Sequence, residues 1–446
     1  MEKLRNLILK ATLALTMVPP PGAFAGGESA RHAQAIRAAP EGGTVESAPP
    51  LLLPQLIAEA RQANPSLLEA RKRWEAAQAR VSQSTGLPAP KIGVEWEEIP
   101  RGSVKINEAT VMYQLIQSLP FPGKLSARRQ VAVKDAQVAA MAFKQAEWQV
   151  LSDLKDVYYA LFLLDREMEI QQEQVSWMRQ MAAAAEARYA SGAGSQAELL
   201  QAQVEALEAA NEVTALMQRR EAMAAHLNHL LNRPFHMPIG QPTALTLSPL
   251  PMTPEELILV AEDRQPEFLA FKYSMERADA AYKLAKRELL PDLETMVELR
   301  DPAMGPIGPW DLSLALVLPF WFWTKARYGV KAALYDRASA EAAYQAMRNE
   351  IAKRIHEHWH GAFASYLTAK LCRDELIGMA TQSAQAAMAS YEGGRGSAME
   401  ALAALRMLGD RRRTYYQHLV EMERHVVMLE QSAGVPLQPD HATSDQ

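Results

Sequence analysis

The sequence contains two copies of one pattern, and this duplication limits the possible folds more than any other feature. The segment "YASGAGSQAELL", which starts at Tyr189, matches "YEGGRGSAMEAL", which starts at Tyr391, at six of twelve positions. Unrelated sequences would match at roughly one position in fifteen. The offset between the copies is 202 residues here and 199 between the "LPF" tripeptides at Leu119 and Leu318, so small insertions separate the halves. We therefore expect two structural repeats with the same order of elements.

Each half contains two segments of about ten residues in which apolar and polar side chains alternate, at about 91–99 and 109–119, and at about 292–300 and 309–318. A period of two residues is typical of a strand with one apolar face. The length suits a tilted strand that crosses a bilayer. A half-buried strand of an ordinary sheet shows the same alternation, so the strands alone leave both possibilities open and favour the ordinary sheet.

A pair of long helices follows each strand pair. The chain has no proline between Lys124 and Tyr189, nor between Lys325 and Tyr391. Either segment, if it is one α-helix, would be about 100 Å long at about 1.5 Å per residue. Apolar residues in the first segment recur every seven positions, as in a coiled coil, at Leu154, Leu161, Met168 and Val175. We expect helices over about 124–190, 195–232, 325–391 and 397–432.

A glycine-rich turn connects the two helices of each pair. Gly192 and Gly394 suit the position just after a helix, where a left-handed backbone is common. Ser195 and Ser397 each precede a glutamate by three residues, which is the capping-box pattern of a helix start. Each half is therefore expected to form a helical hairpin with a tight tip.

The ends of the chain differ from the repeats in composition. Lys3 and Arg5 precede an apolar run, and Ala23-Phe24-Ala25 fits a signal-peptidase site, so residues 1–25 resemble a signal peptide. Residues 26–50 are expected to be a flexible segment, and residues 436–446 a polar disordered tail. The first repeat then covers 51–235, a linker 236–252, and the second repeat 253–435.

Composition excludes several classes of protein. The formal net charge of −5 gives no sign of the basic surface that binds nucleic acid. The single cysteine, Cys372, excludes an internal disulfide. No nucleotide-binding or hydrolase motif occurs, so we expect neither an enzyme nor a cofactor. Past residue 25 there is no apolar run of 18 residues, which argues against a transmembrane helix.

The strand count points to a shared structure. Four strands cannot close a barrel, because about eight is the smallest number in outer membranes, and open edges are not tolerated in lipid. The predicted fold is therefore mostly α with a small β part. Three chains would share a transmembrane β-barrel of 12 strands, four per chain, continued by an α-helical barrel. The alternative, from a different class, is a soluble periplasmic coiled-coil adaptor or scaffold with a small sheet.

The export signal, the doubled layout and the glycine-rich tips resemble the TolC-like outer-membrane efflux protein family over about Leu51 to Val435. The "PFPGK" stretch at 120–124 is similar to the branch that serves heavy-metal cation efflux of the cobalt-zinc-cadmium or copper-silver type. The resemblance implies a homotrimeric duct in the cell outer membrane whose helical barrel extends into the periplasm. It conducts substrate passively and works with a periplasmic adaptor (membrane fusion) protein and an inner-membrane pump, which we expect to be of the RND type. Drug efflux and type I secretion remain alternatives.

The same resemblance assigns roles to the tips. Adaptor docking would fall on nine residues, of which Arg395 stands where the family often has an apolar side chain. They are Gly192, Gly194, Ser195, Leu199, Gly394, Arg395, Gly396, Ser397 and Leu402. Glu400 aligns with a position where some members carry an aspartate ring at the periplasmic constriction, and three copies would favour cations. A capping-box role explains the same glutamate, and the two readings are compatible.

Prolines, aromatic residues and cations gather where each second strand meets its long helix. The expected membrane-interface junction comprises Pro120, Phe121, Pro122, Gly123, Lys124, Pro319, Phe320, Trp321, Phe322 and Trp323. The aromatic residues are typical of a bilayer interface, and outer-membrane lipid phosphates would pair with Lys124, Arg128 and Arg129.

One histidine run is a candidate metal site. His356 and His360 in "RIHEHWH" are four residues apart and share a helix face, whereas His358 points elsewhere. Polar packing along a helical tube is the favoured explanation of the run, so no metal is assigned, and His356 and His360 are the alternative metal-binding pair.

Overall fold

The computed structural model describes residues 50–97, 110–301, 309–319 and 322–437, all within one compact unit, Ala48–Gln446. The signal peptide, nearly all of the 26–50 segment and the tail after residue 437 therefore lie outside the described residues. So do the loops that join the strands within each pair.

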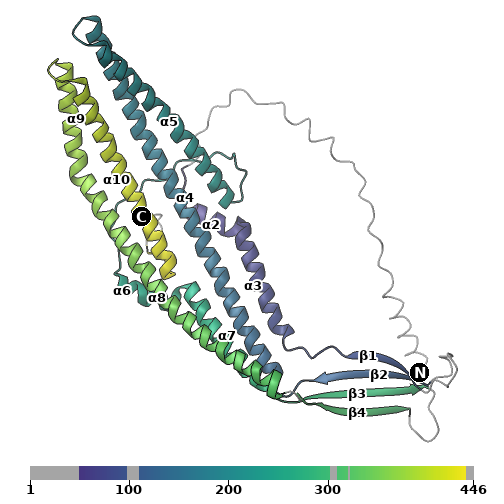
Figure 1. Cartoon of the computed structure of the whole chain (residues 1–446). Coiled ribbons are helices and arrows are strands. Elements are labelled where there is room, and N and C mark those ends of the chain that lie inside the picture. Colours follow the sequence, from purple (N-terminus) through teal and green to yellow (C-terminus); the bar gives the residue numbers. More distant parts are fainter. Residues whose placement is uncertain (1–49, 98–109, 302–308, 320–321, 438–446) are drawn as a thin grey trace, which may run out of the picture. The chain divides into compact units, whose positions relative to one another are not determined.

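The described elements follow the same order in both halves, which confirms the predicted fold class (Figure 1). The first half contains α2 (Leu53–Ala63), α3 (Pro65–Gln83), β1 (Lys91–Glu97), β2 (Thr110–Leu119), α4 (Lys124–Ala190) and α5 (Gln196–Leu230). The second contains α6 (Pro254–Arg264), α7 (Pro266–Arg287), β3 (Asp292–Asp301), β4 (Trp310–Val317), the π-helical turn η2 (Phe322–Ala326), α8 (Arg327–Leu371), the π-helical turn η3 (Cys372–Leu376), α9 (Ile377–Glu392) and α10 (Ala398–Ala433).

Equivalent residues start equivalent helices in the two halves. Asn64 caps α3, and its Oδ1 accepts a hydrogen bond from Ser66 N at 2.9 Å. Gln265 caps α7 in the same way, with its side chain accepting from Phe268 N. A proline follows each cap at the first helical position, where its missing N–H costs nothing. The duplication therefore extends to the hydrogen bonds that begin the helices.

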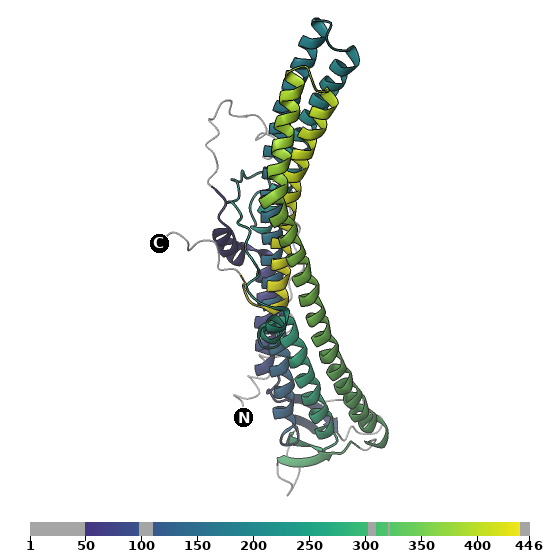
Figure 2. The same ribbon diagram turned by 90° about the vertical axis from the view of Figure 1, so that its left-hand side faces the viewer.

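Helix α4 runs from the sheet to the tips and contacts helices of both halves (Figures 1 and 2). It packs against α3 and α7 toward the sheet and against α5 and α10 toward the tips. Its seven-residue pattern is buried at Leu154, Leu161 and Val175, as the coiled-coil pattern predicts. One core surrounds the middle of α4, a second fills the tip region, and a third lies between α6, α8 and α10.

The long helix predicted over about 325–391 is not one continuous α-helix. The π-helical turn η3 separates α8 from α9, and η2 precedes α8. A π-helical turn holds about one residue more than an α-helical turn. The offset between the halves grows by three residues, from 199 before this region to 202 at the tip (202 − 199). The π-helical turns therefore accommodate part of the insertion that the sequence comparison revealed.

The four strands form one antiparallel sheet in the order β1-β2-β3-β4. The two central strands come from different halves, since β2 pairs with β3 from Val111↔Asp301 to Leu119↔Leu293. Strands β1 and β4 are the edges of this sheet. Among the described residues, no helix has the length and apolar character required to cross a membrane.

Candidate functional site

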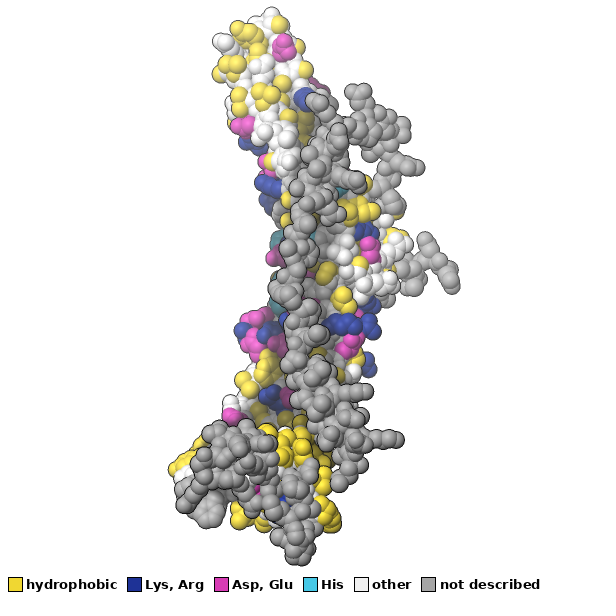
Figure 3. Space-filling view, turned by 90° about the vertical axis from the view of Figure 1, so that its right-hand side faces the viewer, with side chains coloured by type: hydrophobic (Ala, Val, Ile, Leu, Met, Phe, Trp, Pro, Cys, Tyr) yellow, Lys and Arg dark blue, Asp and Glu magenta, His cyan; other side chains and the backbone are white. Residues whose placement is uncertain are grey.

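The register gives the sheet one apolar face and one polar face. Ile92 pairs with Leu115, Leu115 with Val297 and Val297 with Leu312, and paired residues share a face. Their neighbours two positions away continue this apolar face, which includes Val94, Trp96, Val111, Tyr113, Leu119, Leu293, Leu299, Trp310, Leu314 and Leu316. Most of its side chains are exposed, up to 79% for Ile92. Figure 3 shows hydrophobic side chains gathered at the sheet end, whereas charged ones are spread along the helices.

The opposite face of the sheet is hydrogen-bonded and charged. Gln114 of β2 donates through Nε2 to Glu95 Oε2 at 2.5 Å and to Glu298 Oε1 at 2.9 Å. Large apolar surfaces are rarely left in water, and this one is matched by a polar face across the same strands. The arrangement suits a sheet placed between an apolar phase and an aqueous one.

Gly123 and Lys124 join the sheet to α4 through specific contacts. Gly123 has a φ of 93°, a left-handed conformation that favours glycine, and its carbonyl accepts from Arg287 Nη1 at 2.6 Å. Lys124 is 3% exposed. Its Nζ donates to Asp292 Oδ1 at 2.8 Å and to Leu290 O at 2.7 Å. The predicted pairing of Lys124 with lipid phosphates is therefore wrong, because its ammonium group is buried and already satisfied.

The other predicted junction residues are only partly described. Phe121 and Pro122 are exposed, and Phe121 N donates to Asp292 Oδ1 at 2.7 Å, while Pro120 and Pro319 are half-buried. The aromatic residues Phe320 and Trp321, and the side chains of Phe322 and Trp323, lie outside the described part of the chain. The interface role of these residues stays a prediction.

The two tips have the same backbone hydrogen bonds. Gly192 and Gly394 both have a φ of 73°, as expected for the residue after a helix. Gly194 N donates to Arg188 O at 3.0 Å, and Gly396 N donates to Ser390 O at 2.9 Å. A side chain at either of these two glycines would come within about 3 Å of the preceding helix (3.1 Å and 2.9 Å). The repeated glycines therefore follow from the tightness of the turn.

Capping differs between the two tips. Ser397 accepts from Glu400 N at 3.2 Å, and Glu400 Oε2 accepts from Ser397 N at 3.4 Å, which is the complete capping box. Ser195 accepts from Glu198 N at 3.2 Å without the reciprocal bond. Glu400 is exposed, and only its Oε2 takes part in the capping bond.

The side chains predicted to dock an adaptor are not all on the surface. Arg395 is exposed and Leu199 half-buried, but Leu402 is 3% exposed and belongs to the tip core. Leu402 therefore supports the tip from inside instead of offering a contact. Sequence spacing could not reveal this, because its repeat equivalent, Leu200, is exposed.

A contact between the hairpins breaks the symmetry of the tips. Arg188 of α4 lies over the ring of Tyr391 of α9 at 5.0 Å, and its Nη1 donates to Tyr391 O at 3.5 Å. Tyr391 is 1% exposed, whereas its equivalent Tyr189 is 46% exposed. Burial raises the pKa of the Tyr391 hydroxyl, so it stays protonated.

His356 and His360 share one face of α8, as the sequence predicts, whereas His358 has a partner that the sequence did not reveal. His356 and His360 are exposed on α8 with ring centroids 6.2 Å apart. His358 instead faces His425 of α10, and the two Nδ1 atoms are 3.3 Å apart. Burial lowers the pKa of both imidazoles, and the mutual repulsion lowers that of His358 further. The sequence carried no signal for His425, which lies 67 residues away.

Comparison with known proteins identifies the family. The model of the outer membrane efflux protein family matches residues 56–233 and 257–435. No curated protein sequence matches the chain. Among solved structures, the outer membrane protein VceC of Vibrio cholerae is similar, with a TM-score of 0.73 at 16% identity over 86% of this chain and 97% of that chain. The CmeC outer membrane channel of Campylobacter jejuni has a TM-score of 0.75 at 14% identity over 86% of each chain.

The MtrE outer membrane channel of Neisseria gonorrhoeae has a TM-score of 0.69 at 16% identity, over 86% of this chain and 89% of that chain. Identities this low indicate a shared fold only. The family model, in contrast, matches both halves of the sequence and most of the described residues. The chain belongs to the outer membrane efflux protein family.

Proposed function

We propose that this protein is the exit duct of a tripartite efflux system, in which three copies conduct substrate passively from the periplasm to the exterior. An RND-type inner-membrane pump would deliver the substrate through a periplasmic adaptor that docks at the helical tips. The observation that supports this most is the sheet, which has one largely exposed apolar face and two edges that no other described residue of the chain pairs with. An edge in lipid leaves backbone groups without partners, so a neighbouring chain must supply them.

The helices support the same assembly. Toward the tips, α4 packs between α5 and α10, and α9 packs on α10, so α5 and α9 are the outer helices. Leu200, Val204 and Leu207 form an exposed stripe at helical spacing on α5, and Leu207 is 72% exposed. Met379 of α9 is exposed as well. We propose that α5 of one copy packs on α9 of the next copy, and that β1 of one copy pairs with β4 of the next.

Detergent extraction followed by size and conductance measurements tests the duct. We expect the full chain in the outer-membrane fraction, a particle of three chains in detergent, and discrete conductance steps in a planar bilayer. Recovery in the soluble periplasm without detergent would instead support the adaptor or scaffold alternative.

Glu400 is proposed to line the periplasmic constriction. Its exposed carboxylate, repeated by threefold symmetry, would favour cations over anions. Glu400→Gln should reduce cation selectivity and block by trivalent cations. Glu198→Gln, at the equivalent cap of the other tip, is the matched control. Unchanged selectivity in Glu400→Gln would leave capping as the sole role of this glutamate.

Heavy-metal cations are the proposed substrates, and the "PFPGK" resemblance is the support for them. Gly123 and Lys124 of this stretch also have structural roles, so the motif does not depend on the substrate alone. Deletion of the gene in its native host should increase sensitivity to cobalt, zinc, cadmium, copper or silver salts. Increased sensitivity to organic compounds alone would favour the drug-efflux alternative, and loss of a secreted protein would favour type I secretion.

A further inference from the structure

Two histidines from different helices face each other in the helical part of the protein. The Nδ1 atoms of His358 and His425 are 3.3 Å apart, and their ring centroids are 5.6 Å apart. The two nitrogen-bearing edges are therefore turned toward each other. One shared hydrogen bond would satisfy this contact, and so would one ion bound by both nitrogens.

The separation fits two ligands of one tetrahedral metal ion. Zn–N bonds of about 2.0–2.1 Å place two ligand nitrogens about 3.3 Å apart along a tetrahedral edge. In such a site the two Nδ1 lone pairs would converge on an ion beside the line between the nitrogens. Each ring would then carry its proton on Nε2.

The absence of a side chain at Gly361 leaves room for the His425 ring beside α8. A Cβ at residue 361 would lie 2.5 Å from His425 Nε2 and 2.6 Å from Cε1. Only glycine therefore lets the ring lie against the backbone of α8. The contact between the two histidines depends on this close approach as well as on the histidines themselves.

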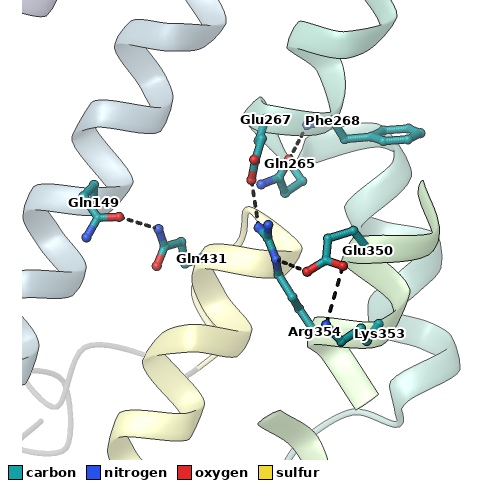
Figure 4. Close-up of polar contacts among 8 residues, drawn as sticks. All are labelled: Gln149, Gln265, Glu267, Phe268, Glu350, Lys353, Arg354 and Gln431. Atoms are coloured by element: carbon teal, nitrogen blue, oxygen red, sulfur yellow. Dashed lines mark hydrogen bonds and ion pairs between the residues drawn. The ribbon is translucent and has the colours of Figure 1, made fainter. Parts of the chain in front are cut away.

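The surroundings keep the two histidines neutral and leave room for water. A cavity of about 280 Å³ lies beside His358 and is also lined by Glu267, Arg354 and Met428. Arg354 is neutralised by Glu267 at 3.0 Å and Glu350 at 3.1 Å, as Figure 4 shows. Burial lowers the pKa of both imidazoles despite the opposing effects of Glu357 on His358 and Glu421 on His425, which keeps both rings in the neutral, metal-binding form at neutral pH.

We propose that His358 and His425 form a binding site for a divalent transition-metal cation of the Zn²⁺ type. Within the described residues no three His, Cys, Asp or Glu side chains are grouped to hold a metal, so water from the cavity completes the coordination. Two protein ligands make an open site from which the ion exchanges. The site does not depend on the substrate that the duct exports.

Calorimetric titration with ZnCl₂ tests the site on the full chain, purified in detergent without a histidine tag. His356 and His360 can themselves chelate a metal at their spacing of four residues, so the reference protein is His356→Gln/His360→Gln. We expect this reference to bind one Zn²⁺ per chain. His425→Gln in the same background should weaken binding at least about tenfold, since even outer-shell changes often cost that much.

Gly361→Ala gives a second test that keeps every histidine. The added methyl group displaces the His425 ring, so we expect a loss of Zn²⁺ affinity similar to that of His425→Gln. Gly378→Ala, whose Cβ would meet nothing within 4 Å, is the matched control and should leave the affinity unchanged. If Gly361→Ala does not assemble, His358→Gln replaces it.

Two results would overturn the site. One is loss of all Zn²⁺ binding in the His356→Gln/His360→Gln protein, which would assign binding to the exposed pair. The other is unchanged affinity in His425→Gln and in the second variant, each shown by circular dichroism and size to be folded and assembled.

Discussion

At the start of α4, a buried lysine connects a helix of the first half to a strand of the second. Lys124 and Asp292 come from different repeats, and the ammonium group also bonds to the backbone of Leu290. A charge held in this way stabilises the fold only while its partner is present. The junction between sheet and helix therefore depends on this pair.

We expect Lys124→Met to destabilise the protein by about 1–3 kcal/mol, below the usual cost of breaking a fully buried pair because Asp292 is partly exposed. Thermal unfolding of the detergent-purified protein measures the effect. Arg129→Gln is the control, since Arg129 is exposed on the same helix, and it should change stability by less than about 0.5 kcal/mol. Equal effects of the two substitutions would show that the pair contributes nothing specific.

At the scale of elements, α10 approaches α4 at a glycine. A Cβ at Gly409 would lie 1.7 Å from Gln174 Nε2. Gln174 is buried, and its Oε1 accepts from Arg413 Nη2 at 2.9 Å. Arg413 also contacts Gln171, another buried polar residue of α4, at 3.5 Å. The two helices therefore meet through a buried polar network that a small residue makes possible.

Gly409→Ala should destabilise the protein by about 1–3 kcal/mol, because Gln174 must move and give up its bond to Arg413. Gly378→Ala lies in an open helical position and should instead stabilise by about 0.5–1 kcal/mol. Opposite shifts of the two melting temperatures are the expected result. A stabilising effect at both positions would mean that the helices at Gly409 have room for a methyl group.

Local signals in the sequence predict most of the elements and few of their partners. Alternation, proline spacing and caps reveal strands, long helices and tips, because each depends on residues close in the chain. The pairing of β2 with β3, the partner of Lys124 and the contact of His425 with His358 join residues far apart. Lysine and histidine side chains look the same in a sequence whether they are solvated or buried, so these features required the structure.

At the scale of the molecule, the two halves form one folding unit. The central strands β2 and β3 come from different halves, and α4 packs on both α7 and α10. Neither half can complete its sheet or its core alone. We therefore expect residues 51–235 and 253–435, expressed separately with an export signal, to give no detergent-stable assembly.

Co-expression of the two fragments tests this expectation, because it restores all the interfaces without the connecting linker. Size-exclusion chromatography after detergent extraction should then show the particle formed by the intact chain. A stable assembly from one fragment alone would mean that the repeats fold independently.

The sheet register constrains how the two halves can diverge. Between Pro90 and Pro291 the offset is 201 residues, and between Leu119 and Leu318 it is 199, a change of two (201 − 199). Through the long helices it then changes by three, which π-helical turns can help to absorb. Shifting a strand by one residue would turn all its apolar side chains to the opposite face. A single-residue insertion within a paired strand of this sheet would therefore turn part of its apolar face to the polar side, whereas π-helical turns let the helices accept such an insertion.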